Sequence, residues 1–380
     1  MAELDPLAVY IHWPYCTRIC PYCDFNVYKT KGNDGALLSS IIRDLEGWRK
    51  DSGPRYITSI HFGGGTPSLL SAEDIKILID KVDALWGLLS ETEIALEANP
   101  IDADPVKWTA YKNNGINRLS LGVQTFDSKA LKFLGRDHSG EQALGALTLA
   151  KSIFPSVSAD IIFGWAGQTQ AQLDHDIKTV LSANTDHIST YQLTIENGTA
   201  FAKAEERGQS RAVNEDASAD FFEAVTTSLL DAGFDHYEVS NFAKPNHSSR
   251  HNLAYWKAFD YVGVGPGAHG RLTIGEQKQA MVCELTPAAY INCVEKNARG
   301  YSAKDLLSPS ERAEEYVLMG LRITEGFSLD HYKHITGNEL EPERYKPLIS
   351  DGLLALHKRK LSATPQGRFV LNALTDALLV

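Results

Sequence analysis

Short apolar runs alternate with longer amphipathic segments through the first half of the chain. This alternation is typical of βαβ units, which build a parallel sheet. Six strands in such an arrangement predict an incomplete (β/α)6 barrel, short of a closed eight-stranded one, with its chemistry at the carboxyl ends of the strands. The predicted strands are Val9–His12, Ile57–Phe62, Glu93–Glu97, Arg118–Val123, Ser158–Phe163 and His187–Leu193, and the predicted helices are Leu37–Lys50, Ala72–Leu88, Pro105–Asn113, Ser128–Leu134 and Gly140–Ser152.

The second half of the chain has a different pattern. Residues 200–300 are less regular, with a helix expected at Ala217–Ala232 and then a passage rich in Gly, His and Asn. The helical pattern returns at Arg312–Arg322, and Tyr345–Leu379 reads as helix, hairpin and helix, like a winged-helix module. We expect a partial barrel over residues 1–235, a connecting region over 236–305, and a smaller, mainly α, winged-helix-like domain over 306–380.

Charge and composition narrow the classes of function. A formal net charge of −11 argues against broad nucleic-acid binding, which needs a basic surface. The terminal helix within 364–379 is also nearly free of basic residues, so we expect the winged-helix-like domain to pack and not to bind DNA. Residues 1–14 show no secretory signal, and no stretch approaches the roughly 18 apolar residues of a spanning helix. A cytoplasmic location is expected by default, with peripheral membrane contact left open.

Three of the five cysteines lie within eight positions, directly after the first predicted strand. Cys16, Cys20 and Cys23 form the spacing C-x3-C-x2-C. A short loop of this kind can hold three corners of a [4Fe–4S] cluster and leave one iron open to an exogenous ligand. The alternative is zinc with His12 or another side chain as a fourth ligand, although structural zinc usually shows a second pair of cysteines. His12 also reads as a buried, hydrogen-bonded core histidine.

The segments YIHWPYC and CPYCDF around these cysteines resemble the radical S-adenosylmethionine (SAM) superfamily. Within it, they are similar to the oxygen-independent coproporphyrinogen III oxidases and to the haem chaperones of the HemW type. The resemblance implies a [4Fe–4S] cluster whose open iron holds SAM. It also implies that the glycine segment presents amides to the amino-acid end of SAM. The implied SAM-site residues are Tyr10 beside the cluster, Gly64, Gly65 and Thr66 in GGGTP, Glu97 in LEANP, Gln124, Arg136 and Asp160.

Two departures separate the chain from the oxidases. Phe25 stands where the oxidase pattern has a further cysteine, and the chain begins almost directly on its first strand. In the other direction, the run from His251 to Trp256 matches the HNxxYW motif of HemW-like proteins. The imidazole of His251 could ligate haem iron while Tyr255 and Trp256 pack on the macrocycle. The simpler interpretation is a satisfied loop histidine beside two aromatic core anchors. His236, His247 and His269 could serve as haem ligands as well.

The resemblance therefore implies a protein that binds haem as cargo and passes it to haemoproteins such as respiratory-chain components. The alternative is a coproporphyrinogen III oxidase of porphyrin biosynthesis that uses a 5′-deoxyadenosyl radical. The sequence assigns no catalytic residue under either hypothesis.

Overall fold

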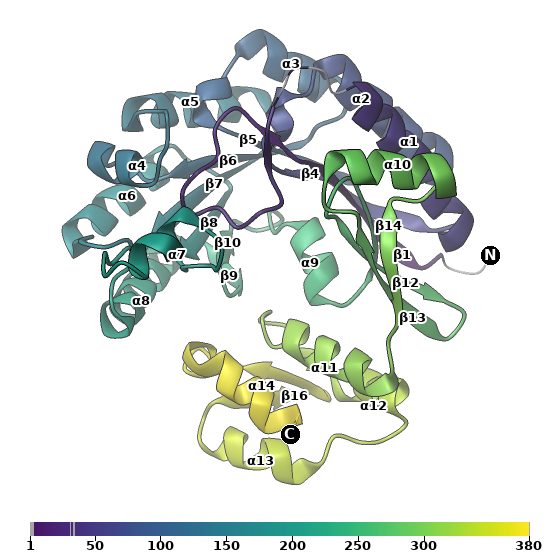
Figure 1. The fold of residues 1–380 in the computed structure, drawn as a ribbon. Helices are drawn as coiled ribbons and strands as arrows, with labels where there is room; N and C mark the ends of the chain where they lie inside the picture. Colours follow the sequence, from purple (N-terminus) through teal and green to yellow (C-terminus); the bar gives the residue numbers. More distant parts are fainter. Residues whose placement is uncertain (1–3, 31, 33–34, 380) are drawn as a thin grey trace.

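Parallel strands follow one another across the centre of the fold in the order in which they occur in the chain. The computed structural model describes residues 4–30, 32 and 35–379. The sheet curves but stays open, as Figure 1 shows, which confirms the predicted partial barrel. All six predicted strands form: β1 (Pro6–Trp13), β4 (Tyr56–Gly64), β5 (Glu93–Ala98), β6 (Arg118–Gln124), β7 (Ser156–Phe163) and β8 (His187–Gln192).

Further strands extend this sheet at both edges, to twelve strands among the described residues. Residues 200–300, expected from the sequence to be less regular, form the expected helix as α8 (Glu215–Asp231) and also supply most of the added strands. One of them, β11, pairs in parallel with β1, and the others pair antiparallel. Short strands with glycines and polar residues lack the apolar runs that marked the first six. The added strands are β9 (Asp235–Glu238), β10 (Asn241–Ala243), β11 (Asp260–Val264), β12 (His269–Ile274), β13 (Gln277–Cys283) and β14 (Tyr301–Leu306).

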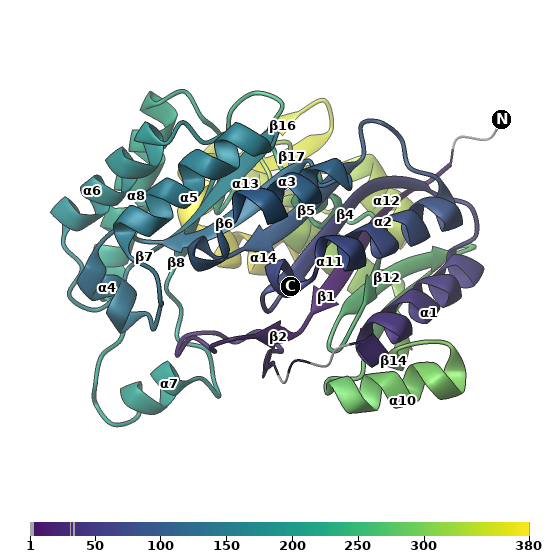
Figure 2. The same ribbon diagram turned by 90° about the horizontal axis from the view of Figure 1, so that it is seen from above.

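Helices cover the outer face of the sheet (Figure 1). Three of them begin with capping boxes, in which Ser71, Ser139 and Thr169 exchange hydrogen bonds with the third helical residue. Apolar faces of these helices and of the strands form one main core. The helices of this layer are α1 (Gly35–Ser52), α2 (Ala72–Trp86), α3 (Pro105–Asn113), α4 (Ser128–Phe133), α5 (Gly140–Ile153), α6 (Gln170–Ser182), α8 (Glu215–Asp231) and α10 (Pro287–Asn297), with 3-10 turns at Pro67–Leu69 and Pro100–Asp102. The short helix α7 (Ala200–Glu205) stands apart from them, on the side of the cysteine loop (Figure 2).

The C-terminal part has its own smaller core and lies against the open side of the barrel, with α9 (Arg250–Trp256) between them (Figure 1). An ion pair of 3.0 Å between Arg271 of β12 and Glu315 of α11 joins the two parts. The predicted helix, hairpin and helix at the end of the chain are confirmed. The elements are α11 (Pro309–Gly320), β15 (Phe327–Ser328), α12 (Leu329–Thr336), α13 (Pro342–Ser350), β16 (Leu354–His357), β17 (Lys360–Ala363), a 3-10 turn (Gly367–Val370) and α14 (Leu371–Leu379). None of the described helices has the length and apolar character needed to cross a membrane.

A glycine-rich turn after β11 brings the backbone close to β1. Gly265 has a φ of +105°, and a Cβ built there would lie 2.2 Å from the backbone oxygen of His12. A Cβ at Gly267 would lie 2.5 Å from the side chain of Asn26. Only glycine can occupy such positions, so this run is a turn of close backbone approach.

Candidate functional site

The cysteines lie on a loop that is closed at its base. Two short strands, β2 (Tyr15–Cys16) and β3 (Tyr28–Lys29), pair in parallel and bring its ends together. The amide of Tyr28 donates to Pro14 O at 2.7 Å, and a turn joins Cys23 N to Cys20 O at 3.2 Å. Figure 2 shows this loop leaving the carboxyl end of β1 on the same side as α7. The backbone therefore fixes where the thiols point.

A cavity of about 420 Å³ lies beside the cysteine loop. It is bordered by the ends of successive parallel strands, which meet at one edge of the sheet. All the predicted site residues except Tyr10 and His251 line it. They are Cys16, Cys20, Cys23, Gly64, Gly65, Thr66, Glu97, Gln124, Arg136 and Asp160.

Arg136 brings a partly buried cation to the thiols. Its Nη1 lies 3.5 Å from Cys20 Sγ, and its Nη2 donates to Asn99 Oδ1 at 2.5 Å and to Gly122 O at 3.0 Å. Sequence reasoning missed Asn99 as a site residue, although it follows Glu97 by two positions in LEANP and lines the same cavity. The available signal was its place directly after a strand end.

The cysteine cavity fits an iron–sulfur cluster by its chemistry. Burial raises the pKa of the Cys23 thiol to about 11 and also raises that of Cys16. Without a metal these thiols hold their protons, so bound iron would supply the charge that makes them thiolates. In the described part of the chain, no three His, Cys, Asp or Glu side chains converge as they would around a single ion. A cubane cluster binds each thiolate at a separate iron.

The glycine segment after β4 contacts the cysteine loop itself. Gly65 N donates to Trp13 O at 2.7 Å and Thr66 N to Tyr15 O at 2.8 Å. Gly64 N donates to Glu97 Oε2 at 3.3 Å. The expectation that these amides are presented to a ligand is therefore wrong, because the pairing of β1 with β4 continues to Gly64. The glycines instead allow the close crossing: a Cβ at Gly65 would lie 2.7 Å from Tyr15 O.

Asp160 is a buried carboxylate in the cysteine cavity. Ser120 Oγ donates to it at 3.0 Å, and Ser158 Oγ lies 3.4 Å from it. Burial is the main cause that raises the pKa of Asp160 to about 6. The folded chain thus holds a proton on Asp160 at a pH where the unfolded chain has released it.

We expect Asp160→Asn to increase stability at pH 7.5 by about 2 kcal/mol, since a neutral amide avoids the burial of a charge. Because its pKa is raised, Asp160 contributes most to the free energy of unfolding below about pH 4. That contribution is lost as the pH rises through about 6. Urea unfolding of both proteins, without SAM, at pH 4.5 and pH 7.5 checks this. The gain should shrink markedly at the lower pH. An equal difference at both values would contradict the prediction.

A second cavity of about 440 Å³ adjoins the first. Phe25, Gly64 and Glu97 line both cavities, so these residues form a shared wall. The second cavity lies where the barrel meets the C-terminal part. Its lining is rich in aromatic and imidazole rings and includes Tyr10, His12, Tyr255, Trp256, Tyr261 and His269, together with Glu315 and Met319 from α11.

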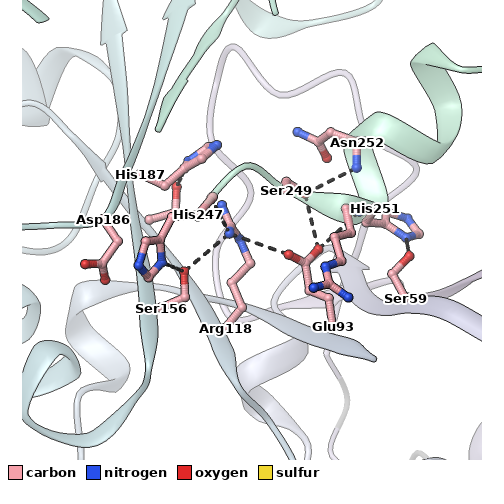
Figure 3. Close-up of polar contacts among 12 residues, drawn as sticks. Ser59, Glu93, Arg118, Ser156, Asp186, His187, His247, Ser249, His251 and Asn252 are labelled. Carbon is pink, nitrogen blue, oxygen red and sulfur yellow. Dashed lines mark hydrogen bonds and ion pairs between the residues drawn. The ribbon is translucent and has the colours of Figure 1, made fainter. Parts of the chain in front are cut away.

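His251 lines neither cavity. Its side chain is 2% exposed, and both ring nitrogens are engaged: Nδ1 with Ser59 Oγ at 2.9 Å and Nε2 with Tyr255 Oη at 3.0 Å. Figure 3 shows it on the buried side of α9, near Ser59 and Glu93. The sequence prediction that His251 contacts haem directly has no support in this geometry, because the α-helix turns its ring into the barrel interior.

Comparison with known proteins agrees with this fold and loop. Residues 10–180 match the Radical SAM superfamily, and residues 307–370 match the HemN C-terminal domain. A solved structure of coproporphyrinogen III oxidase (HemN) from Escherichia coli superposes with a TM-score of 0.83, at 20% identity, over 99% of this chain and 91% of that one. The fold and the cysteine loop thus define a protein of the radical SAM class.

Curated relatives make the assignment more specific. The chain is 34% identical to heme chaperone HemW of Bacillus subtilis, over 98% of this chain and 99% of the relative. It is 32% identical to heme chaperone HemW of Escherichia coli over 100% of both chains. It is also 35% identical to the mitochondrial radical S-adenosyl methionine domain-containing protein 1 of Bos taurus, over 98% of this chain and 87% of the relative. The chain belongs to the HemW family of radical SAM proteins.

Proposed function

We propose that this protein is a haem chaperone that holds a [4Fe–4S] cluster with SAM in the cysteine cavity and haem in the adjoining aromatic cavity. The observation that carries the proposal is the pair of cavities that share Phe25, Gly64 and Glu97 as a wall. A flat, apolar macrocycle suits a lining of aromatic rings. Relatives named heme chaperone HemW align along the whole chain. The acceptors would be haemoproteins, and a cytoplasmic location belongs to the same proposal.

The predicted site residues of the cysteine cavity have three kinds of role in this proposal: ligands of the cluster, a charge partner for it, and contacts to SAM. Cys16, Cys20 and Cys23 would ligate three irons and leave the fourth for the amino and carboxylate groups of SAM. Arg136 would offset the negative charge gathered at Cys20. Glu97, Gln124 and Asp160 would offer hydrogen-bond acceptors and donors to the polar groups of SAM, with Tyr10 across the shared wall. When bound, the cluster supplies an electron donor next to SAM.

The oxidase hypothesis is less well supported. Likeness to HemN at 20% identity concerns the fold alone. Phe25, which is 60% exposed, stands in place of the oxidases' further cysteine and projects an apolar ring between the two cavities. The two relatives reported above at 34% and 32% identity are both named heme chaperones.

Anaerobic titration of the reconstituted protein with haem tests the proposal. We expect a saturable Soret shift at about one haem per chain, and transfer of that haem to an added apo-haemoprotein such as apomyoglobin. The parallel assay supplies coproporphyrinogen III with SAM and a reductant, without oxygen. Turnover of coproporphyrinogen in the absence of saturable haem binding would replace the chaperone proposal with the oxidase.

A further inference from the structure

The second cavity contains two histidines that differ in what their ring nitrogens contact. His12 hydrogen-bonds with Tyr10 Oη at 3.0 Å and with Asn26 O at 3.0 Å, so both of its nitrogens are engaged. His269 also lines the cavity, is exposed, and has no hydrogen-bond partner for either nitrogen among the described residues. An imidazole needs an available nitrogen lone pair to bind a metal. Of the two, His269 is the one that offers it without breaking an existing bond.

The other histidines considered from the sequence lie elsewhere. His236 is 8% exposed and stacks on Phe242 at 4.1 Å, and His247 hydrogen-bonds with Ser156 at 3.1 Å. Neither lines the aromatic cavity. His251 stacks on His61 at 4.7 Å, in addition to its two hydrogen bonds. Its ligation of a guest in the cavity would require those bonds to break and a buried ring to cross the cavity wall.

The backbone before His269 is fixed tightly. Asn26 Nδ2, on the cysteine loop, donates to Pro266 O at 2.9 Å, and Ala268 N donates to Gly265 O at 3.1 Å. A Cβ at Gly263 would lie 2.0 Å from His269 O, so that strand packs directly against the residue. The imidazole therefore projects from the residue that directly follows a rigid turn, as a ligand site requires. That turn is tied to the cysteine loop.

His251 has a different part in the same site. Its backbone amide donates to Glu93 Oε1 at 3.1 Å, which anchors the start of α9 in the barrel (Figure 3). Through Nε2 it fixes the hydroxyl of Tyr255, one turn further along the helix. Tyr255 and Trp256 then form part of the cavity wall. The histidine and the aromatic residues of the HNxxYW run thus face different environments.

We propose that His269 ligates the iron of the cargo haem and that His251 is a positioning residue, which holds Tyr255 and α9 in place. This inference rests on the proposed haem-binding function. It assigns the ligand to the start of β12, outside the HNxxYW run.

Haem titration of the full, reconstituted chain tests the assignment. The variants are His269→Ala, His269→Gln and His251→Ala, with His357→Ala as an exposed histidine on the C-terminal hairpin. We expect His269→Ala and His269→Gln to lose the optical and EPR signature of imidazole ligation and to bind haem at least about tenfold more weakly. Added imidazole should restore the signature in His269→Ala. His251→Ala should keep the signature with a smaller loss of affinity, and His357→Ala should match the wild type.

Unchanged spectra and affinity in both His269 variants would overturn the assignment. Loss of the signature in His251→Ala, with His269→Ala unaffected, would return the ligand to His251. A wild-type protein that binds no haem at all would instead contradict the proposed function, so the two failures are distinct. Since the side chain of His269 is exposed, its replacement leaves the core intact, and far-UV circular dichroism checks this.

Discussion

Replacing any one of Cys16, Cys20 and Cys23 with serine is expected to abolish the [4Fe–4S] cluster. The wild type, reconstituted anaerobically, should hold about four irons per chain and show broad absorption that bleaches with dithionite. A serine oxygen is a poor ligand for cluster iron, and the loop offers no fourth cysteine, because Phe25 occupies the nearby position. Iron content should fall to near zero in each variant.

Cys293→Ser is the matched control for these variants. Cys293 is half-buried on α10 and lies outside both cavities. It should retain the iron content and the absorption of the wild type. Stoichiometric zinc in the wild type, with no iron after reconstitution, would contradict the cluster and support the zinc alternative.

Gly265→Ala is expected to lower the free energy of unfolding by about 4 kcal/mol. The φ of +105° is strained for any side chain, and the new methyl group would meet the backbone oxygen of His12 at 2.2 Å. A backbone atom cannot move aside as a side chain does, so β1 and β11 would have to separate. Urea unfolding measured by circular dichroism gives the value.

Gly233→Ala separates the two causes. Gly233 also has a positive φ, of +81°, but a Cβ there would meet no atom within 4 Å. We expect a loss of about 1 kcal/mol, from backbone strain alone. If the two substitutions lowered the free energy of unfolding equally, the contact between the turn and His12 would make no contribution to the loss.

The sequence was most informative where the residues of a single element determine its structure without distant partners. The strands β1 and β7 are buried on both faces over most of their length, so their segments Val9–His12 and Ser158–Phe163 are rich in apolar residues. The spacing of the cysteines is local in the same sense, since one loop carries all three. The strand β11 escaped prediction because its run leads into glycines and it becomes a strand only by pairing with β1.

The residues of the candidate site show the same difference between local signals and contacts that depend on distant parts of the chain. Glu97 and Gln124 could be placed together from the pattern, because each lies at the end of a parallel strand and those ends share one edge of the sheet. Arg136 follows α4 and Asp160 lies within β7, so the family resemblance alone implied their place in the site. The amides of Gly64 and Gly65 could not be assigned, since their partners are set by register and by a loop far back in the chain.

By itself, the sequence determined the partial barrel, the three thiols and the family to which the motifs point, because apolar periodicity and cysteine spacing are properties of short segments. Only the tertiary structure decided which histidines line the aromatic cavity and how their ring nitrogens are engaged. A histidine on a short helix can point to either side, and the packing of α9 turns His251 into the barrel. The tight turn after β11 places His269 at the start of β12, where it lines the aromatic cavity and neither ring nitrogen has a hydrogen-bond partner among the described residues.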